Sequence, residues 1–77
     1  MSGMTLDHAP LRARLALQEA PAGSGTARRM AALGLRRGAE LILLQATTGG
    51  GRLASVGGSR IALGPAVLRQ LRVELIA

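Results

Sequence analysis

The sequence contains no cysteine, no lysine and no phenylalanine, tryptophan or tyrosine, and each absence excludes a class of function. Without cysteine there is no disulfide framework, no thiolate metal site and no cysteine nucleophile. Without lysine there is no P-loop, because that motif needs a lysine to reach the bound phosphates. Small β-barrels that bind nucleic acid usually stack bases on aromatic side chains, so any such binding here would rest on phosphate contacts and be non-specific and salt-sensitive.

Acidic residues and histidine are also scarce. Asp7, Glu19, Glu40 and Glu74 are spread along the chain with no obvious pairing for acid–base catalysis. His8 beside Asp7 could bind a metal weakly, but two adjacent ligands do not make a metal site. The serines have no candidate base other than His8. We therefore expect no enzymatic activity, no metal site and no cofactor.

The 77 residues that are present suit a single small domain with a core of Leu, Val, Ile, Met and Ala. No apolar run approaches the ~18 residues that span a bilayer and no signal peptide is evident, so we expect a cytoplasmic protein without a transmembrane segment. The net charge of +6 comes from ten arginines and four acids. The arginines are scattered, which fits a solvated surface as well as a nucleic acid, an acidic protein or a membrane as partner.

The periodicity predicts a mainly β fold, a small barrel of about five strands with one short α-helix and a short helical turn before the last strand. A closed barrel would remove the exposed edges of such short strands. Residues 1–10 are expected to be a loose leader that tucks Leu6 against a domain covering residues 11–77. The expected strands are 12–18, 39–46, 52–56, 59–63 and 71–76, with the helix at 26–35 and the helical turn at 65–70.

The segment after the first predicted strand is a short helix with a defined end. Gly34 fits the left-handed residue that ends a helix, and Leu35 should then fold back onto Met30. Ser24 or Thr26 could cap the first turn. The apolar residues at helical spacing are Ala27, Met30, Ala31 and Leu33, whereas Arg28 and Arg29 face away.

The strand at 39–46 follows a turn in which Gly38 takes the position that needs positive φ. Leu41 and Leu43 share one face of this strand, and Ile42 and Leu44 share the other. Apolar residues on both faces mean either that both faces are covered or that one face is an exposed apolar patch. The favoured interpretation is that the helix covers the second face.

The stretch TTGGGRLASVGGSR, residues 47–60, holds two glycine clusters that could suggest a phosphate-binding loop. No two glycines have the five-residue separation of a P-loop, and the dinucleotide fingerprint fails because position 54 is alanine. Both clusters also lie between predicted strands rather than between a strand and a helix. They are therefore expected to be the tight turns on either side of the strand RLASV.

The segments RRMAALGLRRGAELILL, residues 28–44, and GGSRIAL, residues 57–63, resemble the bacterial ferrous-iron transport protein A (FeoA) family. The resemblance covers about residues 4–76, including MTLDHAPLRARL at the start and LRVEL near the end. The sequence departs from the family pattern at Arg37, at Leu11 and in the TTGGGR loop. The residues that carry the family motif are Leu33, Gly34, Leu35, Gly38, Gly58, Arg60, Ile61 and Leu63.

The resemblance implies an SH3-like barrel in the cytosol that assists the membrane ferrous-iron permease by touching its cytosolic GTPase domain. Such contact would use an apolar patch with a basic rim, for which the candidates are Ile42 and Leu44 flanked by Arg28, Arg29, Arg36 and Arg37. Two alternatives are a basic barrel that binds nucleic acid and a free-standing regulatory domain related to iron-dependent repressors. An exposed edge strand could also pair with a second copy, giving a weak homo-oligomer.

Overall fold

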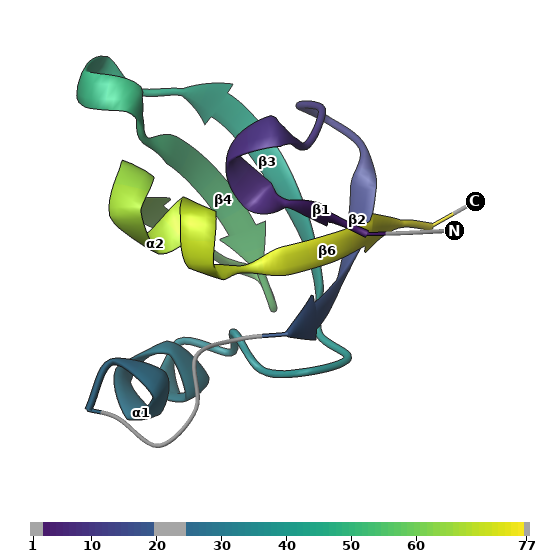
Figure 1. Ribbon diagram of the computed structural model, residues 1–77, viewed down its shortest axis with the longest axis vertical. Coiled ribbons are helices and arrows are strands. Elements are labelled where there is room, and N and C mark those ends of the chain that lie inside the picture. Colours follow the sequence, from purple (N-terminus) through teal and green to yellow (C-terminus); the bar gives the residue numbers. More distant parts are fainter. Residues whose placement is uncertain (1–2, 20–24, 77) are drawn as a thin grey trace.

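The computed structural model describes residues 3–19 and 25–76, which form one six-stranded antiparallel sheet with two short α-helices (Figure 1). The strand order is β1-β6-β2-β3-β4-β5, so β1 and β5 are the edges. The elements are β1 (Met4–Thr5), the 3₁₀ turn η1 (Leu6–His8), β2 (Arg14–Glu19), α1 (Gly25–Ala32), β3 (Glu40–Ala46), the 3₁₀ turn η2 (Thr48–Gly50), β4 (Arg52–Val56), β5 (Ser59–Leu63), α2 (Pro65–Gln70) and β6 (Arg72–Leu75).

This architecture confirms the expected mainly β fold class, and each of the five expected strands is present within two residues of its predicted bounds. The sixth strand is β1, whose two residues are too few to show a period in the sequence. Neither α1 nor α2 has the length and apolar character that crossing a membrane requires.

The core lies on the inner face of the curved sheet and is made of aliphatic side chains. In β2 and β3 the buried residues alternate with half-buried or exposed ones, because successive side chains of a strand point to opposite faces. Leu15 lies opposite Leu41 in the ladder, so the two strands bury the same face. The buried apolar residues are Leu6, Ala9, Leu15, Leu17, Met30, Leu35, Leu41, Leu43, Ala54, Val56, Leu63, Leu68, Leu71 and Val73.

The N-terminal segment belongs to the sheet, so the expected loose leader is wrong for residues 4–9. Met4 pairs with Val73 in β6, and the N–H of Leu6 donates to the carbonyl of Leu71 at 2.8 Å. The expected docking of Leu6 is confirmed, since its side chain is fully buried. Ala9 is buried as well.

The end of α1 has the hydrogen bonds of a Schellman motif, as the sequence predicts. Gly34 has φ +91°, and the N–H of Leu35 donates to the carbonyl of Met30 at 2.8 Å. Met30 and Leu35 are both buried in the core, whereas Leu33 is 44% exposed. The helical spacing that groups Leu33 with Met30 therefore overstates the burial of Leu33, because the chain reversal at Gly34 carries Leu35 inward instead. The expected capping by Ser24 or Thr26 lies outside what the structure describes.

The outer face of β3 is not covered by the helix. Leu41 and Leu43 are buried on the inner face as expected, while Ile42 is half-buried on the other face. Leu44 is also half-buried, but it is the extra residue at a register shift between Leu43 and Gln45. Helix α1 lies beyond one end of the sheet and not over β3 (Figure 1). The favoured interpretation of helix cover was wrong because Gly34 ends α1 early and directs the chain into β3 from that end.

Both glycine clusters form turns between strands. Gly57 and Gly58 have positive φ and join β4 to β5 by a two-residue hairpin, a connection that suits a twisted strand pair. The first cluster forms η2, where the N–H of Thr47 donates to the carbonyl of Gly51 at 2.9 Å. A Cβ at Gly51 would lie 2.7 Å from the carbonyl oxygen of Leu63, so this glycine lets two segments approach closely.

Candidate functional site

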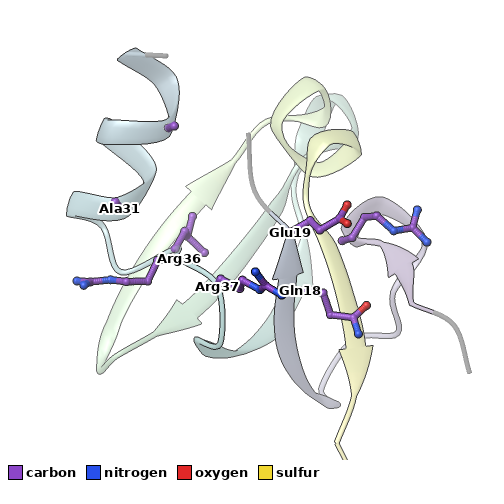
Figure 2. Close-up of a pocket in the computed structure, with 8 residues that line it drawn as sticks. Gln18, Glu19, Ala31, Arg36 and Arg37 are labelled. Atoms are coloured by element: carbon purple, nitrogen blue, oxygen red, sulfur yellow. The ribbon is translucent and has the colours of Figure 1, made fainter. Parts of the chain in front are cut away.

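A pocket of about 660 Å³ lies between α1, the turn that follows it and one end of β2 and β6 (Figure 2). Its walls come from segments that are far apart in the sequence. The lining residues are Gln18, Glu19, Ala27, Ala31, Leu35, Arg36, Arg37 and Arg72.

The turn that carries Arg36 and Arg37 is held against β2 by backbone hydrogen bonds. The N–H of Ala39 donates to the carbonyl of Arg36 at 2.9 Å, and Gly38 has φ +89°, which confirms its expected turn position. Both backbone groups of Leu17 bind this turn. Its N–H donates to the carbonyl of Ala39 and its carbonyl accepts from the N–H of Gly38, each at 2.8 Å. Both arginines therefore project from a fixed backbone next to β2.

A β-bulge in β2 places two consecutive residues on the pocket. Leu17 pairs with Val73 and Glu19 pairs with Arg72, so Gln18 is the extra residue of the bulge. In a regular strand Gln18 and Glu19 would point to opposite faces, but a bulge interrupts that alternation. Both line the pocket, next to Arg72 of the neighbouring strand.

The pocket is basic, with three arginines and one glutamate among its lining residues. Within the described residues, neither Arg36 nor Arg37 has an ion-pair partner, and Arg72 donates from Nη2 to the carbonyl of Gly3 at 3.3 Å. The two arginines of the turn extend in opposite directions, Arg37 toward the side of Gln18 (Figure 2). Guanidinium groups of this kind form strong, often bidentate hydrogen bonds with carboxylates and phosphates.

A second polar cluster lies near the N-terminus, around Asp7 and His8. A hydrogen bond from the Thr5 side chain, together with His8 and Arg69, holds the pKa of Asp7 below its ordinary value. His8 Nε2 lies 3.7 Å from Asp7 Oδ2. The residues that the structure describes contain no group of three or more His, Cys, Asp or Glu side chains that could hold a metal ion.

The six residues predicted for partner contact lie in several places. Arg36 and Arg37 line the basic pocket, whereas Ile42 lines a shallow depression of about 190 Å³ on the outer face of the sheet. That depression is flanked by the ion pair between Arg14 and Glu40, at 3.0 Å. Arg28, Arg29 and Leu44 line neither of these two hollows.

Three polar residues of the basic pocket are absent from the contact residues predicted from the sequence. Gln18 and Glu19 reach it through the bulge, and Arg72 reaches it through antiparallel pairing across more than fifty residues of sequence. A local pattern carries no signal for either effect, because both depend on strand register.

Comparison with known proteins bears on the fold and the family. A family model described as the FeoA domain matches residues 4–75. The chain belongs to the FeoA family. No curated protein matches the sequence significantly.

Solved structures of FeoA proteins share this fold. The zinc complex of Stenotrophomonas maltophilia FeoA, described as a prokaryotic SH3 domain protein, is 30% identical, with a TM-score of 0.73 over 92% of this chain and 89% of that one. FeoA from Chlorobium tepidum is 24% identical, with a TM-score of 0.86 over 96% of this chain and 71% of that one. These likenesses confirm the predicted SH3-like fold.

The same fold also occurs as part of a longer metal-bound protein. ScaR, solved with bound Zn²⁺, is 21% identical with a TM-score of 0.84, and the match covers 97% of this chain but 38% of ScaR. At this identity the likeness shows the fold alone. Zinc binding in ScaR and in S. maltophilia FeoA therefore stays a property of those proteins.

Proposed function

We propose that this FeoA-family chain is a cytoplasmic accessory protein of bacterial ferrous-iron uptake, acting by contact with the cytosolic GTPase domain of the membrane ferrous-iron permease. The observation that carries the proposal is the FeoA domain match over residues 4–75. It is supported by the 30% identical S. maltophilia FeoA, which is itself described as a candidate activating factor of bacterial ferrous iron transport.

Action by contact agrees with the chemistry of the described residues. They contain no three-residue metal-ligand group, and their carboxylates are separated or engaged in surface pairs. Two surfaces are available to a partner, the half-buried Ile42 and Leu44 of β3 and the arginines of α1 and its following turn. Interfaces combine a few apolar anchors with a polar rim, and the two surfaces supply both kinds of residue.

The direct test is binding of the purified full chain to the full-length permease encoded in the same genome, held in detergent micelles. We expect saturable binding, and a matched loss of ferrous-iron uptake in cells that lack the chain but retain the permease at normal abundance. A variant with polar replacements at Ile42 and Leu44 serves as the surface control. Absence of binding would reject action by contact with the permease, and absence of an uptake defect would reject a role in ferrous-iron uptake.

A further inference from the structure

The basic pocket between α1 and the β2–β6 end carries a net positive charge. Its lining has three arginines and one glutamate, and the ion pairs of the described residues lie elsewhere, at Arg14–Glu40 and His8–Asp7. The arginine turn is pinned to Leu17 by two backbone hydrogen bonds of 2.8 Å. The backbone that carries Arg36 and Arg37 is therefore ordered before a partner binds. This lowers the entropy cost of binding an anionic partner.

The pocket also has an apolar wall. Ala27 and Ala31 are four residues apart on α1 and so lie on one face of the helix, with the buried Leu35 beside them. The volume of about 660 Å³ lies within the range of pockets that enclose a ligand. An aliphatic side chain fits this wall, while a purely ionic ligand would leave it unused.

The directions of the arginines decide which anion suits the pocket. Arg36 and Arg37 extend in opposite directions from the turn (Figure 2), and Arg72 comes from β6 on the side of Glu19. A single phosphate would need guanidinium groups that converge on one point. Separated guanidinium groups instead match carboxylates that are separated along an extended chain, and Glu19 can accept a hydrogen bond from a peptide N–H of that chain.

We propose that this pocket binds an extended acidic segment of the protein partner, with its carboxylates on Arg36, Arg37 and Arg72 and an aliphatic side chain against Ala27 and Ala31. The inference rests on the proposed function only for the identity of the partner. Nucleic acid suits the pocket less well, because the chain has no Phe, Trp or Tyr on which a base could stack.

The probe is a short fluorescein-labelled peptide of alternating aspartate and leucine, compared with one that carries asparagine in place of aspartate. Titration of the full chain should raise the anisotropy of the aspartate peptide and leave that of the asparagine peptide unchanged. The double variant Arg36→Gln/Arg37→Gln should weaken binding about tenfold or more, a loss of about 1.4 kcal/mol or more, because it removes both guanidinium groups of the turn.

The matched control is Arg60→Gln/Arg69→Gln, which removes the same charge from exposed positions of β5 and α2 that do not line the pocket. It should weaken binding by less than about threefold, the scale of a screened long-range charge effect. Thermal melts of both double variants confirm that each is folded. Equal weakening by the two variants, or equal binding of the two peptides, would overturn the inference. Displacement of the peptide by a short single-stranded RNA that depends equally on Arg36 and Arg37 would overturn it in favour of nucleic acid.

Binding of the full-length permease to the same variants separates this inference from the proposed function. If the permease binds Arg36→Gln/Arg37→Gln as tightly as the unmodified chain, the acidic-segment inference fails and the proposed function stands. If the permease binds no form of the chain while the aspartate peptide still binds the pocket, the proposed function fails and the pocket remains a site for another acidic partner.

Discussion

At the scale of single residues, Gly34 and Gly38 shape the segment that carries Arg36 and Arg37. Both have φ near +90°, a conformation that is strained for residues with a Cβ. They differ in their surroundings, because a Cβ at Gly34 would lie 3.3 Å from Cγ1 of Val56 and a Cβ at Gly38 would meet nothing within 4 Å. Comparing the same substitution at the two glycines therefore separates the effect of backbone strain from the effect of crowding.

We expect Gly34→Ala and Gly38→Ala each to lower the free energy of unfolding by about 1–2 kcal/mol, the cost of placing alanine in the left-handed region. Gly34→Ala should lose more, since it also crowds Val56. Urea unfolding followed by circular dichroism measures both losses. Equal losses would contradict the contribution of crowding, and no loss in either variant would contradict the strain argument.

Asp7 gives a prediction for the dependence of stability on pH. Its pKa is lowered in the folded chain, chiefly by the Thr5 side chain, so its carboxylate is more favourable in the folded than in the unfolded state. This contribution is fully present above the ordinary pKa of an aspartate and is lost as the pH falls through the lowered folded value. The difference in unfolding free energy between the unmodified chain and Asp7→Asn should therefore shrink on acidification below about pH 4. A difference that stays constant from pH 7 to pH 2 would contradict this assignment.

At the scale of elements, the segment of β1 and η1 completes the core although it is short. Leu6 is fully buried and its N–H binds the carbonyl of Leu71, whereas Leu11 is 43% exposed just before β2. Two leucines five residues apart thus have opposite roles. The burial of each side chain, and not its position near the N-terminus, decides how much it contributes to the stability of the fold.

Leu6→Ala should lower the free energy of unfolding by about 2–5 kcal/mol, the range for removing a buried leucine and leaving a cavity. Leu11→Ala, the matched control, should change it by no more than about 0.5 kcal/mol, as is usual for exposed positions. Chemical denaturation of both variants provides the measurement. Similar small effects would mean that the segment is a loose leader after all.

At the scale of the whole molecule, the net charge of +6 makes weak binding to any polyanion an expected background. With no aromatic platform, binding to short RNA or DNA should rest on phosphate contacts and fall steeply as salt rises. Electrophoretic mobility shifts across a salt series test this directly. Sequence-selective retardation that survives physiological salt would favour the nucleic-acid alternative over an accessory role.

The sequence alone could predict features that depend on neighbouring residues. The period-two pattern of β2 and β3, the helix end at Gly34 and the hairpin glycines 57 and 58 are all confirmed, because local sterics and alternation dictate them. The errors concern β1, Leu33 and the cover of β3. Each of these depends on which distant segment packs against the residue in question.

For the candidate site, the sequence offered Arg36 and Arg37 as candidates but did not predict what surrounds them. The absence of cysteine, lysine and Phe, Trp or Tyr is a property of the chain itself, and it limits the available chemistry before any folding. Only the tertiary structure joins the arginine turn to Gln18, Glu19 and Arg72, because strand register and the β2 bulge determine which side chains meet. Register is set by long-range burial of one sheet face, which no local stretch of sequence contains.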